Sequence, residues 1–213
     1  LGVSYFGIGQ NFGNNNIAFT VSTWDFGDIP LQTESAPEIS SVTYGATFMT
    51  AGLTYARVFT DRISAGTTLK VVSESIDDVN ASAIAFDAGM TYVVGESGLR
   101  LGVALKNIGT KMQYGGVGLT RQVQLPDQTS SATNNAVQLE SEGVELPSLL
   151  NVGVSYTREM GAGAMVTVLG NFRSNSFDQD QYSGGVEVAL FDVLYLRGGM
   201  DIVGDSDLSF YNG

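Results

Sequence analysis

The chain has 213 residues and a formal net charge of −12, and it contains neither cysteine nor histidine. Without these residue types it has no disulfide framework, no usual zinc ligand set and no Ser-His-Asp or Cys-His arrangement for nucleophilic catalysis. The negative charge argues against a nucleic-acid partner, because such binding depends on Lys and Arg that neutralise phosphates. The composition therefore offers none of these common catalytic or zinc-binding arrangements, and we expect no cofactor or metal ion.

Only 15% of the residues are charged, compared with about 25% in typical soluble domains, and 27 residues are glycine. No sustained helical period is present, and no run of about 18 apolar residues predicts a transmembrane helix. The chain starts at Leu1 with a strand-like sequence, so a signal peptide has been removed or the chain is a fragment. The composition predicts an all-β protein.

Strand-like segments bounded by Gly, Asn and Asp follow one another along the whole chain. Many of them are longer than a typical soluble strand and reach the roughly 9–11 residues with which a tilted strand crosses a bilayer. Ten strands are expected, at residues 1–9, 16–28, 50–60, 63–74, 82–94, 99–108, 148–158, 164–173, 181–190 and 193–203.

The connections between these segments alternate in length. Residues 61–62 and 95–98 are short connections, whereas 29–48 and 110–147 are long. Short turns on one rim and long loops on the other are typical of outer-membrane barrels, with the loops outside the cell. We therefore predict a transmembrane antiparallel up-and-down β-barrel in the bacterial outer membrane, with 110–147 as a long extracellular loop. A soluble sandwich has no reason to keep this alternation.

The strands also alternate in the character of their side chains. In the stretch I-S-A-G-T-T-L-K-V-V-S-E (63–74), Leu69 and Val71 fall on one face, and Thr68 and Lys70 fall on the other. Lipid would contact the apolar face, and a lumen would accommodate the small, polar and charged side chains. A soluble sheet with its apolar face turned inward fits the alternation alone as well.

Five stretches resemble the PorV/PorQ family of outer-membrane proteins, in the order expected for that family. They are Y-A-R-V-F-T-D-R-I-S-A-G-T-T-L-K-V-V-S-E-S (55–75), A-I-A-F-D-A-G-M-T-Y (83–92), G-L-R-L-G-V-A-L-K-N-I-G-T-K-M-Q-Y (98–114), E-L-P-S-L-L-N-V-G-V-S-Y (145–156) and G-V-E-V-A-L-F-D-V-L-Y-L-R-G-G-M (185–200).

This resemblance implies a FadL-like barrel of about fourteen strands, of which ten are visible here. We therefore expect residues 1–213 to form a single barrel domain that is incomplete at both ends. The resemblance also implies a non-enzymatic role in type IX protein secretion, in which the protein binds cargo or translocon partners at the cell surface. The alternative is a FadL-like channel for hydrophobic small molecules.

Charged residues on the assumed lumen face are expected to pair across strands. If one hairpin is centred between Asp78 and Val79, Lys70 lies opposite Asp87, and a turn centred on residues 96–97 places Asp87 opposite Lys106. Such pairing would offset the cost of poorly solvated charges. We predict this triad and a second pair, Glu187 with Arg197, as a structural plug of ion pairs or as the lining of a selective permeation path.

The predicted loop 110–147 is too long for a simple connection. Its possible anchors are Tyr114, Val117, Leu119 and Leu125. Because long ordered loops commonly carry function, these residues are candidates for contact with a protein partner. The alternative is a lid folded over the mouth of the barrel.

Several other side chains have two interpretations. Arg57 shares a face with apolar neighbours, so it either faces the lumen or extends its charged end to the membrane rim. Trp24, Tyr44, Tyr156 and Tyr182 belong either to interfacial aromatic girdles or to packed core. Acidic pairs at 178–180 and 205–207 are better explained as solvated loop charge than as calcium ligands, since their spacing matches no recognised calcium loop.

Overall fold

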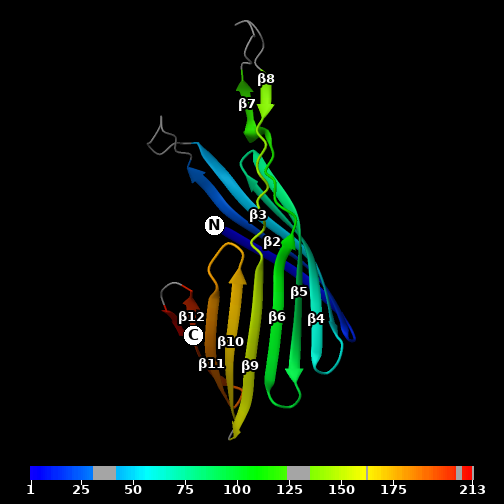
Figure 1. Cartoon of the computed structure of the whole chain (residues 1–213), viewed down its shortest axis with the longest axis vertical. Helices are drawn as coiled ribbons and strands as arrows, with labels where there is room; N and C mark the ends of the chain where they lie inside the picture. Colours follow the sequence, from blue (N-terminus) through cyan, green and yellow to red (C-terminus); the bar gives the residue numbers. More distant parts are fainter. Residues whose placement is uncertain (31–41, 124–134, 162, 205–207, 213) are drawn as a thin grey trace.

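A computed structural model describes residues 1–30, 42–123, 135–161, 163–204 and 208–212, the last group and residue 135 by their backbone alone. Eleven strands form one antiparallel sheet in which each strand pairs with the next along the chain (Figure 1). They are β1 (Gly2–Phe12), β2 (Asn15–Pro30), β3 (Thr43–Val58), β4 (Ile63–Ile76), β5 (Val79–Val94), β6 (Leu99–Gly109), β9 (Leu149–Gly161), β10 (Ala164–Asn175), β11 (Gln181–Leu190), β12 (Leu194–Val203) and β13 (Leu208–Asn212).

All ten predicted strands are present, and β13 is an eleventh that the sequence analysis did not predict. The segment 110–147, predicted as a loop, contains a 3-10 turn, η1 (Val117–Leu119), and a small hairpin of β7 (Thr120–Val123) and β8 (Asn135–Gln138). The described residues include no helix with the length and apolar character needed to span a bilayer.

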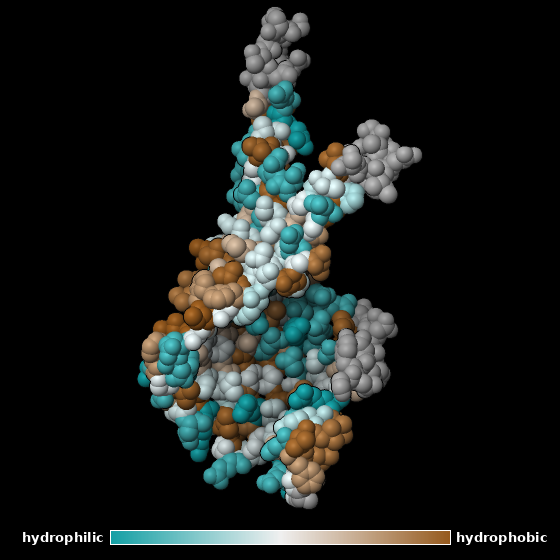
Figure 2. Space-filling view, turned by 180° about the vertical axis from the view of Figure 1, so that it is seen from behind, coloured by the Kyte–Doolittle hydropathy of each residue, from teal (hydrophilic) through white to brown (hydrophobic). Residues whose placement is uncertain are grey.

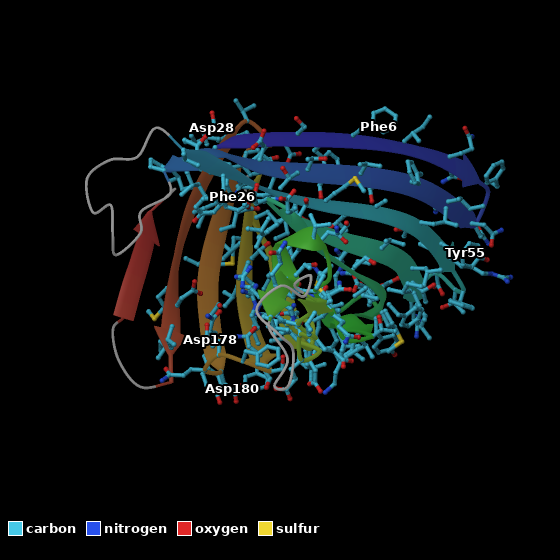
Figure 3. The ribbon with its side chains drawn as sticks, turned by 90° about the horizontal axis from the view of Figure 1, so that it is seen from above. Phe6, Phe26, Asp28, Tyr55, Asp178 and Asp180 are labelled. Carbon is cyan, nitrogen blue, oxygen red and sulfur yellow. The ribbon has the colours of Figure 1, made fainter. Side chains whose placement is uncertain are left out.

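The sheet is not closed into a barrel, so this part of the prediction is wrong for the chain as it stands. Among the described residues, β1 pairs only with β2 and β13 pairs only with β12. Seen from above, the strands follow an arc with two free edges (Figure 3). Because eleven antiparallel strands alternate in direction, β1 and β13 run the same way and cannot pair antiparallel with each other.

The connections lie at two distinct ends of the sheet. The end called here the turn end carries the connections 13–14, 59–62 and 95–98, at the bottom of Figure 1. At the opposite end, the loop end, β2 ends, β3 begins, and residues 110–123 and 135–148 lie between β6 and β9. One connection at the loop end is much shorter than predicted, because β4 and β5 are joined only by Asp77 and Asp78, with Asp77 at a φ of 51°.

The two faces of the sheet differ in a way that reverses the usual burial of apolar residues. On the outer face, Leu69 is 55% exposed and Ile84 is 54% exposed. On the inner face, Thr68 and Lys70 are largely buried. Figure 3 shows the labelled Phe6 outside the arc and Phe26 inside it, and in Figure 2 mainly hydrophilic and neutral residues line the hollow of the sheet.

The described part of the chain has almost no apolar core. Its buried hydrophobic residues are one methionine, Met112, and five alanines: Ala46, Ala81, Ala83, Ala85 and Ala189. A soluble half-buried sheet would cover its apolar face with a second layer of structure. Here the described residues supply no layer over the outer face.

Candidate functional site

An ion pair lies on the inner face towards the loop end, as predicted. The Lys70 ammonium lies 2.8 Å from the Asp87 carboxylate, and both side chains are largely shielded, at 12% and 21% exposure. The register differs from the prediction by two residues: Lys70 is opposite Ala85, and Asp87 is opposite Thr68. The tight 77–78 turn causes this shift. Because a shift of two keeps both residues on the same face, the long lysine side chain still reaches the carboxylate diagonally.

The prediction that Lys106 is the third member of this cluster is wrong. Asn107 occupies that place. The predicted turn centre at residues 96–97 is confirmed, since Val94 pairs with Leu99, but a β-bulge then breaks the register of β5 and β6 beside Asp87. Asn107 adopts a φ of 62° at this bulge, and its backbone N–H donates to Asp87 Oδ1 at 2.7 Å. Lys106 is exposed, and no ion pair among the described residues joins it to Asp87.

The cluster formed by Lys70, Asp87 and Asn107 also holds one end of the 110–147 segment. Lys70 donates to the Asn107 side-chain oxygen, and the Asn107 amide donates to the Pro147 carbonyl oxygen at 2.6 Å. The ion pair therefore sets the position of a bulge, and the bulge fixes the point at which the chain returns to the sheet. A structural role fits this geometry, as the ion-pair interpretation of the sequence predicted.

The base of the 110–147 segment folds back over the inner face at the loop end. Met112 packs against Ala81 and Ala83 of β5, and it exchanges backbone hydrogen bonds with Val144. Gly115 is bridged in the same way to Asn80. Tyr114 donates its hydroxyl hydrogen to Glu74 of β4. The base of the segment is thus a covering layer, which agrees with the lid interpretation for this part.

The four predicted anchors of this segment have different environments. Tyr114 is half-buried and bonded to Glu74, so it contacts the sheet itself. Leu119 is half-buried, and its carbonyl accepts from the Leu139 N–H. Val117 is 72% exposed, and Leu125 lies outside the described residues. Seen from above, β7 and β8 lie within the arc of the sheet, beyond its loop end (Figures 1 and 3).

The second predicted ion pair is confirmed with its predicted register. Glu187 lies directly opposite Arg197 across the 191–193 turn, and the Arg197 Nε donates to the Glu187 carboxylate. This pair is more accessible than the first, because the Arg197 side chain is 63% exposed. No bulge interrupts β11 and β12, so counting from the turn gives the correct partner.

The inner face is hollowed where its side chains are small. A cavity of about 560 Å³ lies along the middle of the sheet. The polar and small residues that line it include Asn16, Ala56, Ser64, Gly66, Thr91, Ala104, Asn151 and Asn171. A larger hollow of about 730 Å³ has a mainly apolar lining, with Met90, Leu101 and Val152 of the outer face.

The structure also separates the alternatives for Arg57 and the aromatic residues. Arg57 lies on the outer face at the turn end, with its guanidinium 5.5 Å from the centre of the Phe59 ring. Tyr156 and Tyr182 are exposed on the outer face, whereas Trp24 lies on the inner face opposite Phe48. Arg57 therefore does not line the inner face.

The described residues contain no group of three or more acidic side chains arranged to hold a metal ion. Asp178 accepts a hydrogen bond from the N–H of its neighbour Gln179 at 2.8 Å, and residues 205–207 lie outside the described residues. No protein-family model, curated protein or solved structure matches the chain.

The shielded ion pair is expected to be energetically coupled. In a double-mutant cycle of Lys70→Met and Asp87→Asn, we expect a coupling energy of about 1–3 kcal/mol, because each change leaves a shielded group without its partner. Urea unfolding of the wild type and the variants measures this value. The matched cycle of Arg197→Met and Glu187→Gln should give less than about 1 kcal/mol, since Arg197 is exposed. Equal coupling in both cycles would contradict the structure.

Contact with Glu74 raises the pKa of Tyr114 from 10.0 to about 12, chiefly through the hydrogen bond and then through burial and the carboxylate charge. Because the folded-state pKa is the higher one, the stabilisation is complete below pH 10 and is lost as pH rises through about 12. The tyrosine titration can be followed by tyrosinate absorbance. The part of the titration at the highest pH should be present in the wild type and absent from Tyr114→Phe, which assigns it to Tyr114. Glu74→Gln should move that component to lower pH, and an unchanged titration would disprove the contact.

Proposed function

We propose that this sheet is part of the wall of a bacterial outer-membrane β-barrel, with lipid against its outer face and water against its inner face. The protein acts as a non-enzymatic barrel of the PorV/PorQ type, which binds protein partners at its loop end. The observation that carries the proposal is the exposure of apolar side chains over the outer face, combined with the small and polar inner face.

The height of the apolar band supports a membrane-spanning position. On β5, apolar side chains occupy the outer face from Ile84 to Val94, which is eleven residues, and the next outward positions are Ser82 and Asn80. The tilted strand of a transmembrane barrel needs about 9–11 residues to cross the hydrocarbon core. The strands are longer than this span, so their polar ends extend beyond the lipid at the loop end.

A closed barrel requires strands besides the eleven described here. Strands in lipid must have all their backbone groups paired, and β1 and β13 each have one free edge. Because these two edges run in the same direction, an odd number of additional antiparallel strands would close the ring with an even total.

The secretion role rests on the family resemblance, and the geometry of the loop end supports partner binding. The base of the 110–147 segment is held by Tyr114 and Asn107, and beyond it Val117 is exposed. An anchored segment with an exposed apolar side chain is suited to contact another protein. The alternative channel for hydrophobic molecules has less support, because the inner-face residues at the cavity are small or polar, such as Asn16, Ser64 and Asn171. The more apolar hollow is lined chiefly by residues of the outer face.

The assignment of the two faces can be tested with tryptophan as a depth probe. In a Trp24→Phe background, which has no tryptophan, Leu53→Trp places the probe on the outer face and Ala56→Trp places it in the inner cavity of the same strand. We expect lipids brominated on their acyl chains to quench Leu53→Trp strongly and Ala56→Trp weakly. Equal quenching would disprove the proposed position in the membrane.

Partner binding at the loop end can be tested by photocrosslinking in bacteria that carry a type IX secretion system. A photoreactive amino acid at Val117 should give protein adducts, because this side chain is 72% exposed at the loop end. The control position is Leu53, which is exposed on the outer face and should give lipid adducts alone. The absence of protein adducts from Val117 would argue against a role in binding partners.

A further inference from the structure

Two arginines face outward at the turn end of the sheet, Arg57 of β3 and Arg158 of β9. Each follows by four residues an apolar side chain that is exposed on the outer face, Leu53 in β3 and Val154 in β9. Because side chains alternate between the faces of a strand, this spacing places both arginines on the outer face. Both are exposed, and neither takes part in an ion pair of the described residues.

Both arginines have the same kind of neighbours along their strands. An exposed tyrosine stands two residues before each of them, Tyr55 and Tyr156, and an exposed apolar residue stands two residues after, Phe59 and Met160. The guanidinium of Arg57 lies 5.5 Å from the centre of the Phe59 ring, so its charged end is directed towards the turn end. Tyrosine is enriched at the membrane interface, and arginine at the edge of the hydrocarbon extends its charged end towards the headgroups.

The tilt of the strands brings the two arginines to one level of the membrane. The strand pairing that starts at Arg57 leads through β4, β5 and β6 to Val152 of β9, six residues before Arg158. In a barrel with strands tilted by about 40°, four strand spacings of about 4.8 Å correspond to a shift of about five residues. The strand ends shift in the same sense, since β3 ends at Val58 and β9 continues beyond the row of that residue to Gly161.

The outward-facing charges of the large sheet are divided by sign between its two ends. In the described strands they are Arg57 and Arg158 at the turn end, and Asp25 and Asp28 at the loop end. Glu159 also lies at the turn end, but it alternates with Arg158 and so faces the inner side. The other acidic residues of the turn end lie in the turns between strands: Asp61, Glu96 and Asp192. The strands thus present only positive charge on the outer face at the turn end.

We propose that Arg57 and Arg158 bind the phosphate groups of two phospholipids in the leaflet at the turn end, and that these contacts fix the depth of the sheet in the membrane. A guanidinium group forms bidentate hydrogen bonds with phosphate oxygens. The two arginines are four strand spacings apart, or at least about 19 Å, so a single phosphate cannot contact both. This inference rests on the proposed function, because it requires lipid against the outer face.

The number of phospholipids that the protein retains tests the two sites. The protein in detergent micelles is titrated with phosphatidylglycerol, and native mass spectrometry counts the bound lipid molecules. At a lipid concentration that just saturates the wild type, we expect two bound lipids in the wild type and one in each single variant, Arg57→Gln and Arg158→Gln. The affinity of the altered site should fall about fivefold or more, the effect expected for loss of one basic residue at an anionic lipid surface.

Arg100→Gln is the matched control. Arg100 is also exposed and lies near the turn end, but it faces the inner side, opposite Ser155. Its replacement should leave two bound lipids. Diacylglycerol with the same acyl chains has no phosphate and should not be retained, and inorganic phosphate should not displace the lipid. An equal lipid count in the wild type and in the double variant of Arg57 and Arg158, an equal loss in Arg100→Gln, or displacement by inorganic phosphate would overturn the proposal.

The outcome is distinguishable from a failure of the proposed function. If brominated lipids quench Leu53→Trp but the lipid count is the same with and without the two arginines, the position in the membrane stands and the phosphate sites are disproved. If Leu53→Trp is not quenched, the protein is not inserted as proposed. Quenching of Leu53→Trp together with two bound lipids that are lost with Arg57 and Arg158 supports both.

Discussion

The structure depends on one constraint. A single-layer sheet must pair its backbone N–H and C=O groups between its own strands, while its apolar side chains are exposed on the outer face. Each strand of the eleven-stranded sheet except β1 and β13 has a hydrogen-bonded neighbour on both sides. Since no large side chain is fully buried in the described residues, the ladder and the surroundings of the outer face stabilise the fold together. An apolar core contributes little, which agrees with the high glycine content and the alternating sequence.

The same constraint explains how the inner face is organised. Two partly buried contacts there involve charged residues, Lys70 with Asp87 and Glu74 with Tyr114. These contacts join strands to the segment that returns between β6 and β9. The Asn107 bulge is the link, because it accepts the Lys70 hydrogen bond and donates to Pro147. Polar contacts on the inner face thus do the work of positioning that an apolar core does in a soluble domain.

The alternation of apolar and polar residues along the strands made most of this fold predictable. Bulges and the two edge strands were not predictable in this way. Counting outward from a turn gave Glu187 and Arg197 correctly because that hairpin has no irregularity. It failed at Lys106, since a single bulged residue moves Asn107 into its place. The signal was an asparagine, a residue that tolerates positive φ, within the strand. Closure was not predictable from alternation, because it depends on which strands meet at the free edges of β1 and β13.

The two ends of the sheet differ in charge as well as in the length of their connections. At the turn end, Arg57, Arg62 and Arg158 are offset by Asp61 and Glu159, so positive and negative charges are mixed. At the loop end, acidic residues such as Glu74, Asp77, Asp78, Asp178 and Asp180 outnumber the basic ones. A net charge of −12 is therefore distributed unevenly, and its field favours the approach of cationic segments from the loop side. The anchored segment packs on Ala81 and Ala83 of β5 and leaves Trp24 47% exposed, so this end also carries apolar surface on its inner face.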